Sequence, residues 1–507
     1  MSHLTSELPT ALYTGAQCRA LDRAAISTFG VPGFQLMQRA GRAAFAELLE
    51  RWPQIKSLSV VCGAGNNGGD GFVIASLAQQ HGLAVQVLVC GEHTEDVCFA
   101  DKLSGEALDA WQQMQAQGVN VTQFSMGVGF DGDVIVDALL GIGLSGDVRG
   151  LAKQAINAIN KANKPVLAVD IPSGLCSDTG SVLGEAVTAD VTVTFIAVKQ
   201  GLLTHQAVNY VGDLLFSDLQ LPEAVYETQP ISAFRTINQE VGELVKPRAL
   251  NAHKGSNGHV LIVAGGKGMG GAGLMCTESA LRSGAGLVTL VTHPDHVTAA
   301  LVRTPEAMVV GVKSAAQLCP LIDKADVIVI GPGLGVDAWG QQLLQAVLQS
   351  DKRQVIDADA LTLMSDASFV VSPKVQRIVT PHPGEAGRVL NQPIALLQEN
   401  RFEAVDAVQR IFGGIALLKG AGTLISDGDV HYVCDRGSPA MAVGGMGDIL
   451  AGIIGALWAQ GLTAVDATRI GAHVHGLAGE KAEKHYGQRG VKATDLVSYL
   501  PNLLSGR

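Results

Sequence analysis

The sequence is poor in features that mark several classes of protein. Charged residues make up 16% of the chain and aromatic residues 5%, and the formal net charge is −11. This negative balance argues against a nucleic-acid binder or a protein of anionic membrane surfaces. No basic-then-apolar segment opens the chain, and the longest strongly apolar run, 449–459, is shorter than the roughly 20 residues that cross a bilayer. We expect a cytoplasmic protein with no nucleic-acid and no membrane partner.

Paired cysteines are lacking as well. The eight cysteines form no CxxC motif and no framework spacing, so we expect small buried hydrophobes in a reducing cytosol. The chain is instead rich in apolar residues, at 47%, and in glycine, with 61 of 507 residues. This composition and length predict a compact, loop-rich enzyme of two or more domains.

In the first half, short β-branched runs alternate with helical stretches. Two alanine-rich helices are expected at 14–29 and 33–51. The expected strands are 58–62, 85–89, 134–137, 166–170 and 191–195. Continuous apolar strands separated by helices form a parallel sheet that is buried on both faces. Residues 1–225 are therefore predicted to form an α/β domain, a Rossmann-like three-layer fold with about five strands.

A second alternation follows a stretch without periodicity. Its expected strands are 259–264, 286–291, 326–330, 353–356 and 377–380. A hairpin is expected over 424–433, with its turn at Asp427 and Gly428. We predict a linker at 226–245 and a second α/β domain at 246–507.

Near the end of the chain, the motif GGMGD at 444–448 precedes an apolar run. Glycine amides can surround an anion because no Cβ blocks the approach, and a helix N-terminus adds its positive dipole end. Asp448 at this point can take a proton from a hydroxyl that attacks a phosphate. The pattern favours phosphoryl transfer. The alternative is an ordinary Gly-rich turn capped by Asp, which has the same sequence motif.

The first half carries a glycine loop between a strand and a helix. Gly63, Gly65 and Gly68 satisfy GxGxxG, so a hydride-transferring dehydrogenase is a rival hypothesis. Asn66 and Asp70 argue against it, because a plain dinucleotide turn needs only backbone at those places.

Oxygen-bearing side chains follow three strands of this half. Asn67 lies in the glycine loop, Asp137 and Asp170 end two strands, and Ser173 follows shortly after. Ligands of open α/β sheets bind outside the carboxyl ends of the strands, so these residues should share one crevice. Such a set suits K⁺, Mg²⁺ or ribose hydroxyls. The alternative, that each Asp only caps a helix, is weaker for successive strand ends.

Three motifs of the first half, NNGGDG at 66–71, VDALLG at 136–141 and VDIPSG at 169–174, resemble the epimerase domain of the bifunctional NAD(P)H-hydrate repair enzymes. The resemblance covers most of residues 10–220. Its implied substrate is NAD(P)HX, a hydrated nicotinamide dinucleotide with a hydroxyl beside the ring nitrogen. That hemiaminal-like centre can invert through reversible ring opening or loss of hydroxide.

The same resemblance implies a set of site residues. Asn67, Asp137 and Ser173 would ligate K⁺. The implied contacts with NAD(P)HX are Asn66, Asn67, Gly68, Gly69, Asp70, Gly141, Ile142, Gly143, Leu144, Ser145, Gly146, Asp147 and Asp170. Asp170 is our candidate for moving the proton. Lys199 is a second candidate, with a solvated strand-end lysine as the alternative reading.

Four loops of the second half are expected at strand ends. They are 264–273, Gly331–Gly335, Thr380–Glu385 and Lys419–Thr423. One glycine loop is weak evidence, but four of them with GGMGD indicate a phosphate site. His382, between two prolines, is expected to contact substrate. Glu385 either orients Mg²⁺ or begins a helix, and His473 and His475 are expected to be structural.

These features resemble the ribokinase-like superfamily and, within it, the ADP-dependent NAD(P)H-hydrate dehydratases, across residues 246–505. The resemblance implies a ribokinase-like α/β fold, ADP with Mg²⁺, and a homo-oligomer. The implied nucleotide contacts are Lys419, Gly420, Ala421, Gly422, Thr423 and Gly447. The implied hydrate contacts are Ala272, Gly333, His382 and Asp448.

The leading hypothesis is a two-site repair enzyme. Its first half would interconvert R- and S-NAD(P)HX. In its second half, Asp448 would deprotonate the hydroxyl of the S form, ADP would phosphorylate it, and phosphate would leave as NAD(P)H forms. The chief enzymatic alternative is a ribokinase-like small-molecule kinase, and the non-enzymatic alternative makes the first half a regulatory ligand-binding module.

Overall fold

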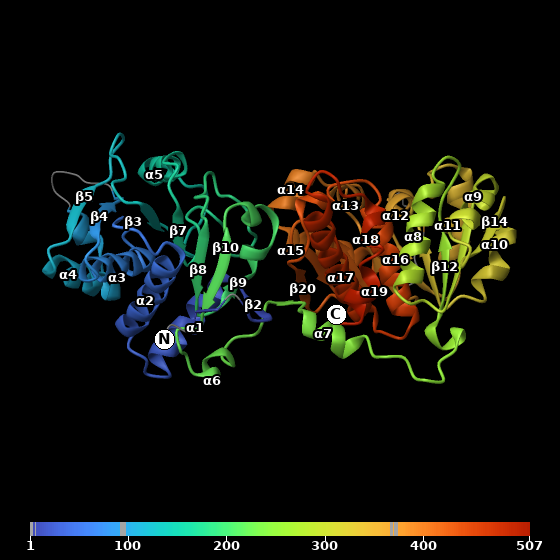
Figure 1. Ribbon diagram of the computed structural model, residues 1–507, viewed down its shortest axis with the longest axis horizontal. Coiled ribbons are helices and arrows are strands. Elements are labelled where there is room, and N and C mark those ends of the chain that lie inside the picture. Colours follow the sequence, from blue (N-terminus) through green and yellow to red (C-terminus); the bar gives the residue numbers. More distant parts are fainter. Residues whose placement is uncertain (1–3, 6, 92–97, 366–368, 370–373, 507) are drawn as a thin grey trace. The chain divides into compact units, whose positions relative to one another are not determined.

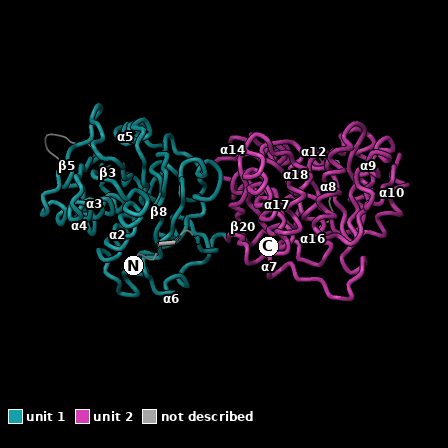
Figure 2. Tube along the Cα trace, viewed as in Figure 1, with its two compact units in different colours: residues 1–233 teal, residues 234–507 magenta. Residues whose placement is uncertain are grey.

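The computed structural model describes residues 4–5, 7–91, 98–365, 369 and 374–506. The chain divides into two compact units, residues 1–233 and 234–507 (Figure 2). Within the described residues no helix is long and apolar enough to cross a membrane. All eight cysteines are free. Cys18, Cys62, Cys276 and Cys434 are buried as expected, but Cys98 and Cys319 are exposed, so the expectation of buried hydrophobes is wrong for these two.

The sheet of unit 1 contains eight strands among the described residues. Their order is β1 (Leu4–Thr5), β10 (Asp213–Ser217), β8 (Val191–Phe195), β7 (Val166–Val169), β6 (Val134–Ala138), β3 (Ser57–Cys62), β4 (Ala84–Val89) and β5 (Asn120–Gln123). All pairings are parallel except that of β1 with β10. The five predicted strands are confirmed. The prediction missed β1, β5 and β10. β1 has only two residues, β5 carries polar residues at three of its four positions, and the apolar run of β10 is only three residues long.

Helices cover both faces of this sheet (Figure 1). The helices are α1 (Gly15–Ser27), α2 (Gly33–Arg51), α3 (Asn66–Gln80), α4 (Gly105–Ala116), α5 (Gly150–Lys161) and α6 (Glu223–Tyr226). Val60 and Val136 pack into one core with α2, α3 and α4. Val61 and Ile135 point the other way and pack against α5. This alternation confirms the predicted three layers.

Unit 2 has a second, mostly parallel sheet. Its strands follow the order β14 (Met308–Gly311), β13 (Leu287–Thr292), β12 (His259–Val263), β15 (Val327–Ile330), β16 (Arg353–Ile356), β17 (Arg377–Val379), β18 (Ile415–Leu418), β19 (Thr423–Ser426) and β20 (His431–Cys434). β14 to β18 are parallel. β19 and β20 form the predicted hairpin, where the Asp427 carboxylate accepts from the Val430 amide at 2.8 Å.

The core of unit 2 is built around α16 (Met446–Ala459), an almost entirely buried helix. Against it pack α8 (Gly270–Arg282) and α17 (Ala464–Tyr486). The other helices are α7 (Asn238–Leu244), α9 (Val297–Arg303), α10 (Ala315–Ile322), α11 (Ala338–Leu348), α12 (Ala358–Met364), α13 (Pro383–Leu390), α14 (Ile394–Glu399), α15 (Arg401–Phe412), α18 (Ala493–Leu496) and α19 (Leu500–Leu504). The stretch 226–245, expected to be a linker, contains β11 (Ala233–Arg235) and α7.

Two glycines set how closely α3 approaches β3 and the loop after β6. A Cβ at Gly63 would lie 2.0 Å from the Leu139 carbonyl oxygen, and one at Gly68 would lie 1.9 Å from the Gly63 carbonyl oxygen. Both positions therefore exclude any side chain. The close approach fixes the start of α3 at the carboxyl ends of the strands.

We predict that Gly68→Ala destabilises unit 1. The added Cβ must displace backbone, and overpacking of this kind costs about 1–3 kcal/mol of unfolding free energy. Gly65→Ala is the matched control, because nothing lies within 4 Å of a Cβ at that position. Calorimetry of the full chain measures both, and hydrogen exchange locates the change in α3 and β3. Equal effects of the two variants would contradict this packing.

Candidate active sites

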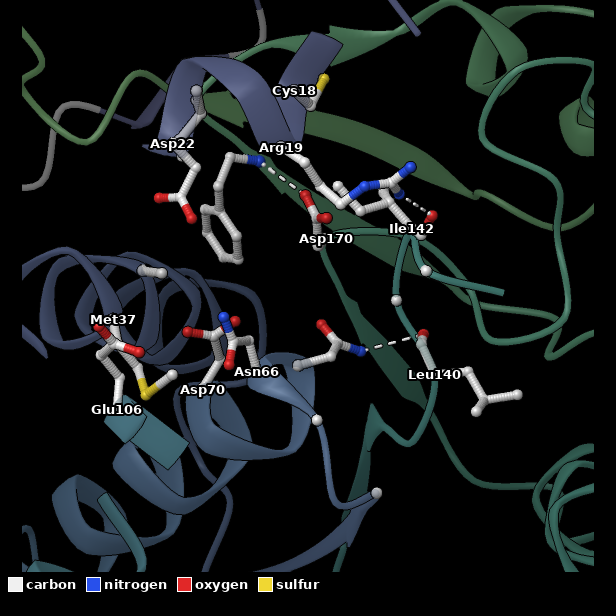
Figure 3. Close-up of a pocket in the computed structure, with 18 of the residues that line it drawn as sticks. Cys18, Arg19, Asp22, Met37, Asn66, Asp70, Glu106, Leu140, Ile142 and Asp170 are labelled. Atoms are coloured by element: carbon white, nitrogen blue, oxygen red, sulfur yellow. Dashed lines mark hydrogen bonds between the residues drawn. The ribbon is translucent and has the colours of Figure 1, made fainter. Parts of the chain in front are cut away.

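A cavity of about 880 Å³ opens in unit 1 at the carboxyl ends of the strands. Its walls come from α1, α2, the start of α3 and the loops that follow β6, β7 and β8 (Figure 3). A volume of this size is typical of a pocket for a small molecule or cofactor. A crevice is therefore present where predicted, with Asn67 and Asp170 in its wall, but Asp137 and Ser173 are fully buried and are not among its lining residues.

Most of the predicted substrate residues line this cavity. They are Asn66, Asn67, Asp70, Gly141, Ile142, Gly143, Leu144, Ser145 and Asp170, together with Lys199. Gly68, Gly69, Gly146 and Asp147 are not among its lining residues. A Cβ at Gly69 would lie 2.5 Å from the Met37 side chain, so Gly69, like Gly68, is a packing position.

Asp170 and Lys199 form a buried ion pair on the wall of the cavity. The Lys199 ammonium, 1% exposed, also donates to Thr194 Oγ1 and to the Phe195 carbonyl, each at 3.0 Å. Asp170 adopts a φ of +66° and accepts from the Phe195 amide at 3.1 Å. The reading of Lys199 as a solvated lysine is therefore wrong, and the pair is held in one orientation.

Further carboxyl groups face the same cavity. Figure 3 shows Asp22 of α1 and Asp70 of α3 pointing into it. Burial, followed by the nearby carboxylates of Asp170 and Asp22, raises the pKa of Asp70 well above its ordinary value. Burial and Glu106 raise the pKa of Asp22 as well. Acids in a cavity whose pKa values are raised by burial are candidates for proton transfer.

The structure brings Asn67, Asp137 and Ser173 together around the Leu140 carbonyl. The Ser173 hydroxyl donates to Asp137 Oδ1 at 2.6 Å, and the Ser173 amide donates to Asp137 Oδ2 at 2.8 Å. Asn67 Nδ2 donates to the Leu140 carbonyl at 3.1 Å. Burial raises the pKa of Asp137 to about 6 despite these bonds. Asn67 Oδ1 is buried and has no hydrogen-bond partner in the part of the chain that the structure describes, so this oxygen is available as a ligand for a hard cation.

In unit 2 the ends of three adjacent parallel strands meet in one ion pair. The Lys419 ammonium, after β18, lies 2.5 Å from Asp357 Oδ1, after β16. Thr380, after β17, donates its hydroxyl to the same oxygen at 2.8 Å. Asp357 is 1% exposed, and its Oδ2 has no hydrogen-bond partner among the described residues. Burial would lower the pKa of Lys419, but Asp357 and Glu385 outweigh it and raise the pKa.

The GGMGD segment begins α16 beside this pair. Gly445 caps the helix with a φ of +92°. A Cβ at Gly447 would lie 3.0 Å from Lys419 Nζ, which shows how closely the helix start approaches the lysine. Asp448 lies in the first turn, where burial and then the nearby Asp357 raise its pKa to about 7. Its carboxyl group can therefore exchange a proton at neutral pH.

The His382 and Glu385 side chains cap α13. His382 Nδ1 accepts from the Gly384 amide at 2.9 Å, and Glu385 Oε2 accepts from the His382 amide at 2.8 Å. Glu385 therefore begins a helix, as one of its two readings predicted. Nδ1 is an acceptor here, so the half-exposed imidazole carries a proton on Nε2, which lies 3.4 Å from Glu385 Oε1.

The remaining predicted residues are also placed. Ala272 and Gly333 lie side by side, since a Cβ at Gly333 would be 2.9 Å from the Ala272 methyl carbon. His473 and His475 are buried in α17, and burial lowers the pKa of each to about 4. Neutral, buried imidazoles agree with the structural role predicted for them.

Comparison with known proteins shows which family this chain is similar to. The family model described as NAD(P)H-hydrate dehydratase matches residues 260–502, and the model described as YjeF-related protein N-terminus matches residues 33–201. The bifunctional NAD(P)H-hydrate repair enzyme Nnr of Coxiella burnetii is 44% identical over 98% of this chain and 100% of its own length. The Escherichia coli enzyme of the same name is 38% identical over 98% of this chain and 95% of its own length.

The chain belongs to the family of bifunctional NAD(P)H-hydrate repair enzymes. The resemblance recognised in its motifs is thereby confirmed, and the dehydrogenase hypothesis for the GxGxxG loop is wrong. Among solved structures, the ADP/ATP-dependent NAD(P)H-hydrate dehydratase of Bacillus subtilis, co-crystallised with ATP and Mg²⁺, is 28% identical over 53% of this chain and 96% of its own, with a TM-score of 0.48.

For a repair enzyme of this family, the sequence interpretation overlooked several residues that the structure places at the sites. Asp357 ends β16 and carried the same strand-end signal that identified Asp137 and Asp170. Arg19 and Asp22 are one helical turn apart on α1, and the Arg19 guanidinium donates to the Ile142 carbonyl at 2.7 Å. Their spacing indicates a shared helix face, but only the tertiary structure shows which face meets the cavity.

Asp448→Asn should make the folded chain more stable at high pH. The pKa of Asp448 rises from 3.8 to about 7 on folding, so the folded state disfavours the carboxylate. This penalty is absent below pH 3.8, grows toward pH 7 and is complete above it. We expect the free energy of unfolding of the variant to exceed that of wild type by about 1–4 kcal/mol at pH 8. At pH 3.5 the two free energies should be equal.

Denaturant unfolding across this pH range measures the difference. Asp429→Asn, which removes an exposed carboxylate, should follow the wild-type profile. An Asp448→Asn profile parallel to wild type at every pH would show that the carboxylate is not disfavoured by folding.

Proposed function

We propose that this chain repairs hydrated NADH and NADPH in two steps. Unit 1, within residues 1–225, interconverts R- and S-NAD(P)HX, and unit 2, within residues 246–507, converts the S form to NAD(P)H while ADP is cleaved to AMP and phosphate. The observation that carries the proposal is the Asp448 carboxyl with its pKa of about 7, seated at a helix N-terminus beside Lys419. By the same family resemblance, the working form is a cytoplasmic homo-oligomer.

The unit 2 reaction begins at the hydroxyl of the S-hydrate. Asp448 takes the hydroxyl proton, and the oxygen attacks the terminal phosphorus of ADP, whose P–O bond to AMP breaks. Phosphate then leaves with the electron pair of the C–O bond. Loss of a proton from the neighbouring ring carbon restores the double bond of NAD(P)H. Phosphorylation thus turns a poor leaving group into a good one.

The surrounding residues support this transfer. The Lys419 ammonium and the N-terminus of α16 favour the negative charge of the transferring group. The nucleotide lies against 419–423 and Gly447, while Ala272, Gly333, His382 and Asp448 contact the hydrate. The unpartnered Asp357 Oδ2 and the buried Glu385 fit Mg²⁺, which when bound would neutralise phosphate charge.

In unit 1 the Asp170–Lys199 pair moves the proton that accompanies reversible ring opening, or loss and return of the hydroxyl, at the hemiaminal-like centre. The pair is fixed, buried and on the cavity wall, so a base and a cation face the same ligand. The proposed substrate residues include all those in segments 66–70 and 141–147. K⁺ would be held by Asn67, Asp137 and Ser173, where Asn67 Oδ1 is left without a partner. A bound K⁺ would fix the loop that carries Leu140.

The two activities should separate by mutation. Asp448→Asn is expected to reduce ADP-dependent formation of NAD(P)H by about 10²–10⁴ and to leave epimerisation intact, because it removes one positioned proton acceptor. Asp170→Asn should do the reverse. The measurement uses purified R/S hydrate mixtures, absorbance of the reduced nicotinamide, and chromatography of the two epimers.

Each variant is the control for the other. Loss of both activities in either variant would contradict the two-site assignment. Release of a stable phosphorylated product with ADP or ATP would favour the small-molecule kinase, and epimerisation that survives Asp170→Asn would favour the ligand-binding module.

Removal of K⁺ should slow the epimerase alone. We expect a loss of about tenfold or more when K⁺ is replaced by Na⁺, because the smaller ion fits the same oxygens poorly and the loop near Leu140 loses support. Rates of both activities in K⁺ and Na⁺ buffers measure the effect. Equal epimerase rates in the two buffers would remove the proposed ion site.

A further inference from the structure

A buried arginine lies under the loop that follows β18. Arg401, the first residue of α15, is 1% exposed. Its guanidinium donates to the carbonyls of Leu418 at 3.3 Å, Lys419 at 3.4 Å and Gly422 at 3.5 Å. It also donates to Gln398 Oε1 at 2.9 Å. One planar cation thus ties both ends of the loop together.

The loop is shaped to lie directly on this guanidinium. Gly420 has a φ of +143°, and a Cβ there would lie 2.8 Å from Arg401 Nη1. The hydroxyl of Thr423 donates to the Gly420 carbonyl at 2.9 Å, which closes the loop from its other side. The path of residues 419–422 therefore depends on Arg401 and on the absence of a side chain at 420.

The Arg401 guanidinium is hydrogen-bonded to neutral oxygens and not to a carboxylate of the described residues. Its hydrogen-bond partners are three carbonyls and an amide, and none of the described residues forms a salt bridge with it. Burial lowers its pKa to about 10. A buried cation without a counter-ion is unfavourable, and it becomes favourable when an anion lies nearby.

We propose that Arg401 is a positioning residue for the nucleoside diphosphate. It holds the loop 419–422 in its binding shape, and its charge beneath the loop favours a polyanion on the other side. This inference rests on the proposed role of Lys419–Thr423 in nucleotide binding. No contact between Arg401 and the ligand is needed for it.

The test is titration of the full chain with ADP by calorimetry, together with KM measurements. Arg401→Met should raise the Kd and the KM for ADP by about tenfold or more, since it removes hydrogen bonds from a charged donor. The KM for the S-hydrate should change less than twofold. Arg401→Lys should lie between wild type and Arg401→Met, because an ammonium keeps the charge but cannot span the three carbonyls.

Arg377 offers a matched control. It is also 1% exposed and donates to Gln354 Oε1 at 3.0 Å. It is the first residue of β17, however, and so lies at the amino end of that strand, away from the loop that follows β18. Arg377→Met should lower the unfolding temperature and leave the Kd for ADP within twofold of wild type. If Arg377→Met weakens ADP binding as much as Arg401→Met, the positioning role is wrong.

Gly420→Ala tests the same loop with the arginine in place. Its Cβ would press on the guanidinium, so the Kd for ADP should rise as in Arg401→Met even if the latter folds poorly. An unchanged Kd in Gly420→Ala, or in folded Arg401→Met, would overturn the inference. A wild-type chain that binds no ADP would instead overturn the proposed function, and this inference with it.

Discussion

Parallel strands deliver the residues that follow them to the same edge of a sheet, and the chemistry of both units depends on this constraint. In unit 2 it brings Asp357, Thr380 and Lys419 from three adjacent strands into one hydrogen-bonded group. In unit 1 it brings Asp137 and Asp170 to one end of the sheet. Neither group could form from residues close in sequence.

Both units contain a lysine that pairs with an aspartate at the end of a strand. One lysine neutralises one strand-end acid, Lys199 with Asp170 and Lys419 with Asp357. A second acid lies near each pair, Asp70 in unit 1 and Asp448 in unit 2, and burial raises its pKa despite the nearby lysine. Pairing fixes the geometry, while the raised pKa of the second acid favours its protonated form.

Much of this arrangement could be predicted from the sequence. Continuous apolar strands revealed both sheets. Oxygen-bearing residues at strand ends indicated the cavity of unit 1, and glycine loops with the GGMGD motif indicated the region of Lys419 and Asp448. Motifs do not reveal packing, and only the structure shows that Gly68 and Gly69, which the resemblance assigns to substrate contact, also lie against Gly63 and Met37.

Other features depend on tertiary contacts that a sequence pattern does not contain. Asp22 and Glu106 reach the cavity from helices whose orientation is set only by packing. Arg401 lies 18 residues before the Lys419 carbonyl that it binds. The edge strand β5 has only one apolar residue among its four, and β10, which lies between β1 and β8, has an apolar run of only three residues, so neither gave a clear strand signal.

The central claim is that the hydroxyl of the hydrate leaves as phosphate and not as water. The most direct measurement uses S-NAD(P)HX that carries ¹⁸O in this hydroxyl, incubated with the full chain and ADP, with mass spectrometry of the inorganic phosphate. The account predicts one ¹⁸O atom in each phosphate formed together with NAD(P)H. Unlabelled phosphate, with the isotope recovered in water, would contradict it.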